Sequence, residues 1–467
     1  MIPMNLSDVA SVMNGSLILP ADVLESSVVS GLSDTDSRLI EPGGIFFAKP
    51  GEATDGHLFI PQAIERGAAL LIVDRPVDAE VPYIVVDDTV QALADLAREV
   101  VSRVRTRGQL KTIGITGSNG KTTTKNLIAA LCATHGETVW PKASFNNEVG
   151  APLTMLKLTM GTEFLVLELG ASGIGHIERL TKLAPLDIAV VLMIGLAHAG
   201  EFGGIENTVI AKTELVHGLV PGGVAILNRD DPRVRGMADV APGPVRWFGL
   251  TEQCDVRATN VSTSLSGTHF DLSVNGVAGH LDFRVIGEHH VMNALAAVAV
   301  ATELGFALDE TLSTLSDVQR AERWRMEVMA GNGFTVINDA YNASPDSMAA
   351  ALKTLVQVAP KGSRTIAVLG EMAELGEYSG EEHDRIALLV VRLNIDTLVV
   401  VGEGARRLHI SAINEGSWDG ESVYFASLDE AYDYVVGHVA PGDVILVKSS
   451  NSANLRFLGD RLGEVNA

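Results

Sequence analysis

The chain has 467 residues, of which 46% are hydrophobic, and its formal net charge is −23 at pH 7. Its length predicts about two to four domains, and its acidity argues against a nucleic-acid-binding protein, because such proteins need a basic face to displace counterions from phosphates. Two cysteines, Cys132 and Cys254, are too few for a disulfide framework or a cysteine metal site. We therefore expect any anionic ligand to be held by local positive groups.

The sequence predicts a cytoplasmic protein that does not insert into a membrane. It has no run of about 18 to 20 consecutive apolar residues, the length that a spanning helix requires. The first six residues also lack the basic start and the apolar stretch of a secretory signal.

Residues 1–108 are expected to form a small mixed α/β domain. Short apolar runs alternate there with turns, and residues 90–104 have the apolar spacing of a helix. Arg38 and Lys49 are candidate anion contacts. A solvated turn with a stabilising Asp–Arg pair is the more common explanation of the segment that contains Arg38.

A phosphate-binding loop is predicted between an apolar strand and the helix that begins near Lys121. Gly117 and Gly120 allow backbone N–H groups to converge at the positive end of this helix, where phosphate oxygens bind. Lys121 adds a charge for the β- and γ-phosphates, and the Thr122 hydroxyl is a candidate ligand of the Mg²⁺ that accompanies ATP. The spacing departs from the strict P-loop pattern, because Ile115 takes the place of its first glycine. A glycine-rich turn with a surface lysine is the alternative, which Gly-Lys-Thr after a strand disfavours.

Two further apolar strands are predicted, at 164–170 and 188–194, and both should end at the same crevice as the loop strand. The carboxyl ends of parallel strands form the ligand-binding edge of an open α/β sheet. Glu168 and His198 therefore join Thr122 as candidate metal ligands. A loop histidine satisfied by hydrogen bonds is an equally good interpretation of His198.

The rest of the central unit is predicted to contain a helix, a strand and a β extension. The helix over 205–219 carries Lys212, which its spacing alone leaves as a solvent-facing lysine. Residues 254–286 alternate as in a small antiparallel extension. An alanine-rich helix then begins near residue 287, and the polar residues that open it either cap the helix, the more common role, or face a ligand.

Residues 322–467 predict a second doubly wound sheet. The expected strands and helices alternate along the chain: strands 335–337, 365–369, 398–401 and 444–447, and helices 347–358, 383–393, 428–436 and 454–462. Polar residues follow the strand ends, namely Asp339, Tyr341, Asn342, Glu371, Glu374, Lys448 and Ser449. Helix-capping turns explain some of them. The facing strand ends of two domains nevertheless make a natural cleft.

Over nearly all of its length the chain resembles the Mur ligase family. The motifs that carry the resemblance are Thr116-Gly117-Ser118-Asn119-Gly120-Lys121-Thr122-Thr123, residues 145–152, Glu168-Leu169-Gly170-Ala171, His198, residues 211–214 and residues 339–345. Within the family, residues 168–171 and 368–376 are similar to the member that adds D-alanyl-D-alanine rather than a diamino acid. The resemblance implies a monomeric ATP-dependent amide ligase of peptidoglycan synthesis, with UDP-N-acetylmuramoyl-tripeptide as its other substrate.

The same resemblance implies three domains and a role for individual residues. Residues 1–108 would bind the UDP-sugar, a central P-loop doubly wound sheet over 109–321 would bind ATP, and a Rossmann-like sheet over 322–467 would bind the dipeptide. The implied ATP contacts are Gly117, Ser118, Asn119, Gly120, Lys121, Thr122, Thr123, Asn293, Arg325, Asp339 and Asn342. The implied Mg²⁺ ligands are Thr122, Glu168, His198 and Lys212 as a carbamate, of which the last three act with Lys121 in catalysis. The implied substrate contacts are Asp36, Ser37, Arg38, Lys49, Asn146, Asn147 and Lys448.

Two positions depart from the usual family pattern. His290 takes the place of an asparagine, and Lys448-Ser449-Ser450-Asn451 takes the place of Lys-Gly-Ser-Arg, so that Arg456 becomes a candidate for the missing charge. Two other functions therefore stay open: a related ligase that adds a single amino acid, or glutamate to a folate, and an ATP-gated binding protein without the transfer step.

Overall fold

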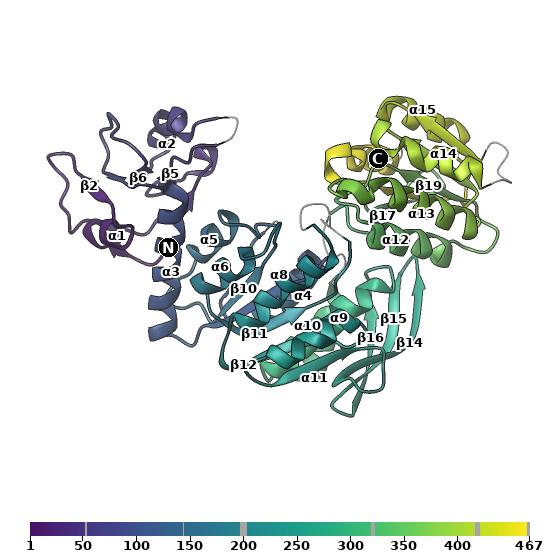
Figure 1. Cartoon of the computed structure of the whole chain (residues 1–467), viewed down its shortest axis with the longest axis horizontal. Helices are drawn as coiled ribbons and strands as arrows, with labels where there is room; N and C mark the ends of the chain where they lie inside the picture. Colours follow the sequence, from purple (N-terminus) through teal and green to yellow (C-terminus); the bar gives the residue numbers. More distant parts are fainter. Residues whose placement is uncertain (52–53, 143, 197–202, 319–322, 416–420, 465–467) are drawn as a thin grey trace.

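The structure is a computed structural model that describes residues 1–51, 54–142, 144–196, 203–318, 323–415 and 421–464. Three sheets of five or more strands follow one another along the described chain, one in each of the three lobes of Figure 1, from purple through teal to yellow. Among the described residues, no helix combines the length and the apolar composition needed to cross a bilayer.

The N-terminal lobe is a small mixed sheet, as the sequence predicts. Its strands lie in the order β2 (Ser16–Ile18), β7 (Tyr83–Val85), β6 (Leu70–Val73), β5 (Ile45–Phe47) and β4 (Ser33–Asp34). Only β2 is antiparallel to its neighbour within this sheet. The lobe also contains α1 (Leu6–Val12), α2 (Ile60–Glu65) and a two-stranded pair of β1 (Met4–Asn5) with β3 (Val28–Val29).

Helix α3 (Thr89–Arg107) joins the first lobe to the second, and it confirms the helix predicted over 90–104. Asp88 begins it, because its Oδ1 accepts hydrogen bonds from the backbone N–H groups of Val90 (2.8 Å) and Gln91 (3.1 Å). The buried face of α3 packs against α5 (Gly150–Met155) and α6 (His176–Leu183) of the central lobe. One apolar core consequently runs from the first sheet to one face of the second.

The central lobe holds a nine-stranded sheet. The strands are, in spatial order, β16 (Val277–Phe283), β15 (Gly267–Val274), β14 (Val256–Ser264), β13 (Val245–Gly249), β12 (Leu219–Asn228), β11 (Leu186–Val191), β8 (Lys111–Thr116), β10 (Phe164–Glu168) and β9 (Thr138–Val139). The strands from β14 to β9 in this order are parallel to their neighbours. Strands β14, β15 and β16 form the predicted antiparallel extension, which continues the main sheet.

Helices cover both faces of the parallel part. Helices α4 (Lys121–Ala133) and α10 (His289–Glu303) pack together on one face, and α6 and α8 (Ile205–His217) lie on the other. The two short helices α9 (Pro232–Arg235) and α11 (Leu308–Asp317) complete the lobe. Burial on both sides explains why every residue of β10 is buried.

The C-terminal lobe is a second doubly wound sheet, in the order β17 (Glu327–Ala330), β18 (Thr335–Asn338), β22 (Val444–Lys448), β19 (Thr365–Leu369), β20 (Thr397–Val401) and β21 (Ser422–Phe425). Only the edge strand β17 is antiparallel. Helices α12 (Pro345–Val358), α13 (Ser379–Arg392) and α14 (Arg406–Asn414) cover one face, and α15 (Leu428–His438) and α16 (Leu455–Glu464) cover the other. The four strands and four helices predicted here are confirmed to within a few residues, whereas β17, β21 and α14 were not predicted.

Candidate active site

The predicted phosphate loop lies between β8 and α4. Gly120 is the residue before α4 and has φ +85°, a conformation that favours glycine, and a Cβ there would lie 2.3 Å from Asn293 Oδ1. The Ser118 hydroxyl donates to the Gly195 carbonyl (3.0 Å) and accepts from the Gly195 N–H (2.8 Å). These contacts hold the loop in a fixed curve, with its amides at the positive end of α4.

Lys121 opens α4 and folds back over the loop. Its Nζ donates to the Gly117 carbonyl at 2.8 Å. Burial lowers the pKa of Lys121, an effect that the Glu168 carboxylate opposes and the Arg325 guanidinium reinforces. A phosphate oxygen can take the place of the loop carbonyl as the partner of this cation.

Glu168 ends β10 and is 1% exposed. Its Oε1 accepts a hydrogen bond from Asn146 Nδ2 at 2.8 Å, whereas its buried Oε2 has no hydrogen-bond partner. Thr122, the second candidate ligand, has its Oγ1 3.2 Å from Ser144 Oγ. A buried carboxylate oxygen without a donor calls for an explanation, and a cation supplies one.

These oxygens fit Mg²⁺ bound together with a nucleotide. Mg²⁺ is commonly held by one or two protein oxygens and completed by phosphate oxygens and water. The described residues contain no group of three or more histidine, cysteine or carboxylate side chains that could hold a metal ion. The third predicted ligand, His198, lies outside the described residues.

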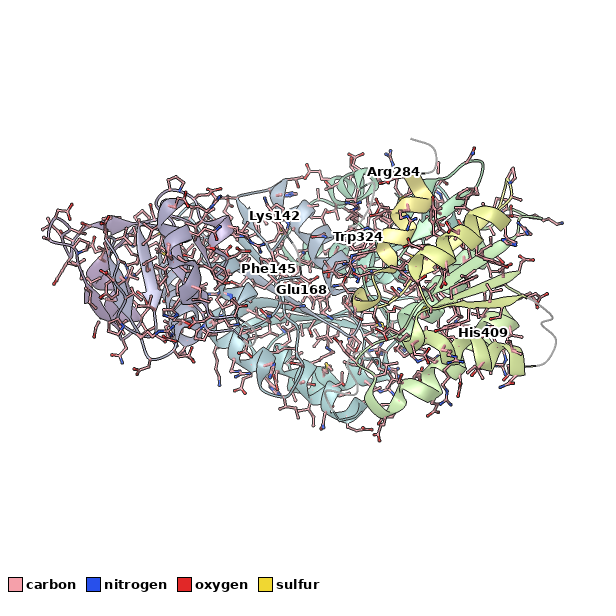
Figure 2. The ribbon with its side chains drawn as sticks, turned by 90° about the horizontal axis from the view of Figure 1, so that it is seen from above. Lys142, Phe145, Glu168, Arg284, Trp324 and His409 are labelled. Carbon is pink, nitrogen blue, oxygen red and sulfur yellow. The ribbon has the colours of Figure 1, made fainter. Side chains whose placement is uncertain are left out.

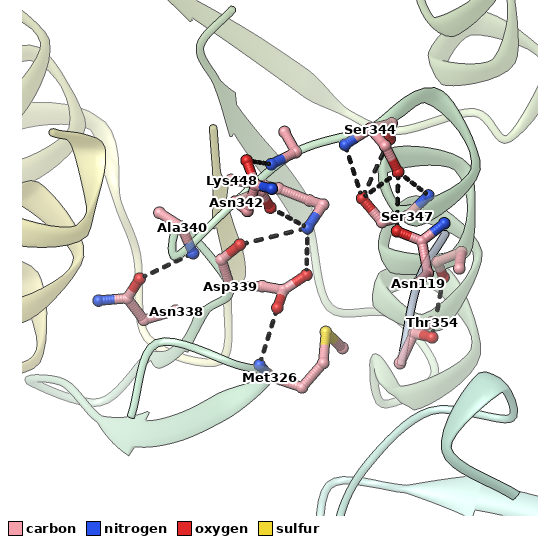
Figure 3. A network of polar contacts seen from close by, with 12 residues as sticks. Asn119, Met326, Asn338, Asp339, Ala340, Asn342, Ser344, Ser347, Thr354 and Lys448 are labelled. Carbon is pink, nitrogen blue, oxygen red and sulfur yellow. Dashed lines mark hydrogen bonds and ion pairs between the residues drawn. The ribbon is translucent and has the colours of Figure 1, made fainter. Parts of the chain in front are cut away.

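The C-terminal lobe contacts the loop directly. Arg325 Nη2 donates to Thr122 Oγ1 (3.1 Å), and its guanidinium lies 4.2 Å from the centre of the Tyr341 ring. Ser344 Oγ donates to Asn119 Oδ1 at 3.0 Å, as Figure 3 shows. The structure thus brings Arg325, which precedes β17, and Tyr341 and Ser344, which follow β18, onto the nucleotide side of the central sheet.

Lys448, at the end of β22, is 2% exposed and is held by several polar contacts (Figure 3). Its Nζ contacts Asp339 Oδ2 at 2.6 Å and donates to the Asn342 carbonyl at 3.0 Å. Asp339 Oδ1 accepts from the Met326 N–H at 3.0 Å. All three of Lys448, Asp339 and Asn342 line the same cavity as the phosphate loop, so the structure places Lys448 on the nucleotide side rather than in the larger cavity described below.

Two histidines at the start of α10 line this cavity as well. Nδ1 of His289 and Nε2 of His290 are buried without a hydrogen-bond partner, while His290 Nδ1 lies 3.1 Å from Asn293 Nδ2. Burial lowers the pKa of His289 to about 4 and also lowers that of His290 well below its usual value. Both imidazoles are therefore neutral at pH 7 and can make hydrogen bonds without adding charge.

Two cavities meet at the phosphate loop. The smaller one, of about 260 Å³, is the nucleotide-side cavity just described. The larger one, of about 530 Å³, lies between α3, α6 and the segments that follow β9 and β10. Lys121 and Asn146 line both cavities. A group held by Lys121 is consequently accessible from either side, and Figure 2 shows Glu168 of this region near the middle of the molecule.

Lys212 of α8 lines the larger cavity. The residue spacing of the helix predicts that Lys212 faces solvent, but in the structure Lys212 is only 3% exposed. The difference arises because α8 packs on the sheet beside the loop, so that Lys212 faces inward. Burial lowers its pKa well below the usual value, and the positive charge of Lys121 adds to this effect.

The substrate contacts implied for the N-terminal lobe are not brought to either cavity. Arg38 is exposed and pairs with Asp36 at 2.6 Å, which is the surface ion pair that its sequence context favours. The Ser37 hydroxyl donates to Gln62 Oε1 at 2.6 Å. Lys49 follows β5 and lines neither cavity. Asn147 does line the larger one, where its Oδ1 accepts from the Gly150 N–H at 2.9 Å.

Sequence reasoning missed most of the cations of the larger cavity. Arg98 comes from α3, and Arg179 and Lys182 come from α6. In the sequence each is an ordinary charged residue on an amphipathic helix, and only the packing of α3 against α6 brings them together.

Comparison with known proteins supports the interpretation of these motifs. Three family models match the chain: "Mur ligase family, catalytic domain" over residues 33–100, "Mur ligase middle domain" over 115–301, and "Mur ligase, glutamate ligase domain" over 324–451. The UDP-N-acetylmuramoyl-tripeptide–D-alanyl-D-alanine ligase of Mycobacterium tuberculosis is 40% identical, over 99% of this chain and 98% of its own. The chain belongs to the Mur ligase family.

Solved structures agree with this assignment to the Mur ligases. MurF from Acinetobacter baumannii is 31% identical and covers 99% of both chains with a TM-score of 0.88. MurF from Thermotoga maritima, solved in complex with ADP, is 26% identical and covers 93% of this chain and 98% of its own, with a TM-score of 0.82. The three-domain α/β fold predicted for the chain is therefore confirmed.

The structure also shows how this Mur ligase accommodates one change in its Lys448–Asn451 segment. A Cβ on Gly370 would lie 2.7 Å from Ser449 Cβ, so the glycine leaves room for the serine. At Asn451, Arg456 Nη1 donates to the backbone carbonyl at 2.7 Å and reaches the side-chain oxygen. A guanidinium is thus present beside the position where the family pattern has arginine.

Proposed function

We propose that this chain is an ATP-dependent ligase that joins D-alanyl-D-alanine to UDP-N-acetylmuramoyl-tripeptide, giving the pentapeptide, ADP and phosphate. The observation that carries the proposal is the pair of cavities that share Lys121 and Asn146. One is built for a nucleotide, and the other has a cationic wall for an anionic substrate. A phosphoryl group held at Lys121 can therefore pass from the nucleotide in one cavity to the substrate in the other.

The chemistry follows from the poor reactivity of a carboxylate as an acyl donor. The γ-phosphoryl group of ATP moves to an oxygen of the tripeptide's terminal carboxylate, which gives an acyl phosphate. The amine of the dipeptide then forms the new C–N bond, the C–O bond to phosphate breaks, and the amine loses a proton. Lys121 and the loop amides offset the repulsion between the two anions of the first step. A Mg²⁺ ion, held by Thr122 and Glu168, would add further charge neutralisation.

We also propose the division of roles among residues 1–108, 109–321 and 322–467, for the UDP-sugar, ATP and the dipeptide. Helix α3 supports the first of these roles, because it supplies Arg98 to the cavity that the central lobe opens. The contacts of Arg325 and Ser344 with the loop support a C-terminal lobe that closes over ATP and excludes water. We place the reaction in the cytoplasm, where ATP is available.

The acceptor amine decides between this proposal and its rivals. Phosphate release should require ATP, Mg²⁺, UDP-N-acetylmuramoyl-tripeptide and D-alanyl-D-alanine together. Turnover driven by free D-alanine, a diamino acid, or glutamate with a folate would indicate another ligase of the family. ATP binding without phosphate release for any acceptor would indicate a binding protein.

Lys212 is proposed to act as a carbamate. An amine must be neutral to react with CO₂, and the burial of Lys212 beside Lys121 favours the neutral form. The resulting anion would serve as an oxygen ligand for a second cation. With ¹³C-bicarbonate, a carbamate resonance should be visible in the wild type and in Lys182→Ala, and absent in Lys212→Ala. An unmodified Lys212 amine in active, ATP-bound enzyme would contradict the proposal.

A further inference from the structure

The larger cavity has one lining residue from the C-terminal lobe, Glu374. It follows β19, which ends at Leu369, and its side chain is exposed. Helices α3 and α6 supply cations to the lining of the same cavity, namely Arg98, Arg179 and Lys182. The cavity therefore has a cationic side formed by the first two lobes and a carboxylate from the third.

The backbone at Glu374 is held in an unfavourable conformation. Its φ is +63°, in the left-handed region that L side chains other than Asn and Asp seldom adopt. Such strain persists only where the surroundings impose it, and it is common at functional sites. The two preceding residues are anchored by hydrogen bonds: the Met372 N–H donates to His383 Nε2 (3.2 Å), and the Ala373 N–H donates to Ser450 Oγ (2.8 Å).

The other two carboxylates of the cavity come from the first two lobes. Asp88 caps α3 through the N–H groups of Val90 and Gln91. Glu148 contacts Arg179 at 3.4 Å. Glu374 differs from both in its origin, because it enters the cavity from the lobe that is proposed to bring the second substrate.

We propose that Glu374 binds the α-ammonium group of the incoming D-alanyl-D-alanine and aims its nitrogen at the acyl carbon. The proposal rests on the proposed function and deepens it. The UDP-tripeptide presents phosphates and carboxylates, which suit the cationic walls, whereas the dipeptide presents an ammonium at the end that reacts. A carboxylate that faces the same cavity is the complementary group for that end. Before attack the ammonium gives up a proton to solvent water, so Glu374 acts in binding and orientation.

Steady-state kinetics of the full-length enzyme tests this assignment. In Glu374→Gln and Glu374→Asn, the KM for D-alanyl-D-alanine should rise by about 10- to 100-fold, the range expected for a lost charge-assisted hydrogen bond. The KM values for ATP and for UDP-N-acetylmuramoyl-tripeptide should stay near those of the wild type. Glu377→Gln, which removes the same charge from an exposed residue outside the cavity, should behave as the wild type.

Two further measurements separate binding from a structural effect. Asparagine adopts a positive φ more readily than glutamate, so Glu374→Asn should melt at or above the wild-type temperature even though it loses affinity for the dipeptide. N-acetyl-D-alanyl-D-alanine lacks the ammonium, so its inhibition constant should be the same for the wild type and Glu374→Gln.

Several results would overturn the assignment. The first is an unchanged KM for the dipeptide. The second is a rise in KM for the UDP-tripeptide alone, which would indicate that Glu374 binds an ammonium of its third residue. The third is an equal loss of affinity for the acetylated dipeptide. Each of these leaves wild-type turnover with D-alanyl-D-alanine intact, and therefore leaves the proposed function standing. A wild-type enzyme that releases no phosphate with this dipeptide would remove both.

Discussion

At the scale of single residues, the nucleotide site depends on the missing Cβ of Gly120 and on a buried oxygen of Glu168. Gly120 has no Cβ, and Asn293 Oδ1 occupies the space that a Cβ would need. Glu168 offers a buried oxygen that has no donor. The Gly-Lys-Thr pattern predicts the loop, because it encodes local backbone freedom. It says nothing of Asn293, which comes from a helix far along the chain.

Gly120 has a matched control in Gly175, which also precedes a helix and has φ +89°, but has no atom within 4 Å of an added Cβ. Gly175→Ala should cost about 1 to 2 kcal/mol of unfolding free energy, from its left-handed conformation alone. Gly120→Ala should cost more, because its Cβ displaces Asn293, and it should also weaken ATP binding by at least about tenfold. Urea denaturation and calorimetric titration with ATP would measure both effects. Equal losses in the two variants would contradict the close-packed loop.

At the scale of elements, the segment between the central and C-terminal lobes has a backbone conformation that its sequence does not predict. Trp324 and Met326 both have positive φ, at +59° and +49°, and they flank Arg325. No local pattern predicts two left-handed residues of this kind, since glycine and asparagine are the usual ones. The reason is tertiary: Asp460 of α16 accepts from Trp324 Nε1 (3.0 Å) and from Arg323 Nη2 (2.9 Å).

Asp460→Ala should release this segment. Asp460 also accepts from Asn338 Nδ2 (3.1 Å), so the loss of its carboxylate leaves several donors unpaired and should lower the unfolding free energy by about 2 to 3 kcal/mol. The KM for ATP should rise severalfold, because Arg325 is no longer held against Thr122. Asp429→Ala is the control, because it breaks an exposed pair with Arg461 and should change stability by less than about 1 kcal/mol. An unchanged KM for ATP in Asp460→Ala would contradict the role given to the segment.

Regular elements were predictable where burial repeats with a fixed period. Helix α3 has such a period, and the parallel strands β10, β19 and β22 are short apolar runs that are buried throughout, so their predicted bounds are close to the observed ones. The buried state of Lys212 was not predictable, because it depends on how α8 packs beside the loop. The edge strands β17 and β21 are short and partly exposed, so they carry little periodic signal.

At the scale of the whole molecule, the arrangement of three lobes creates the two cavities. Helix α3 bridges the first lobe to the second, and the contacts of the third lobe with the phosphate loop close the nucleotide side. Sequence periodicity could predict each sheet but not the orientation of one lobe against another, which rests on contacts between residues as distant as Asn119 and Ser344. The family resemblance implied a three-domain α/β fold but no orientation of its lobes, and the comparison with MurF structures confirms that fold.

The central claim is that phosphoryl transfer links the two cavities at Lys121, and an isotope measurement tests it most directly. The enzyme would be supplied with UDP-N-acetylmuramoyl-tripeptide whose terminal carboxylate carries ¹⁸O, together with ATP, Mg²⁺ and D-alanyl-D-alanine. The account predicts that each phosphate released contains one oxygen from that carboxylate, because the C–O bond of the acyl phosphate breaks when the amine attacks. Released phosphate without ¹⁸O, at normal turnover, would contradict it.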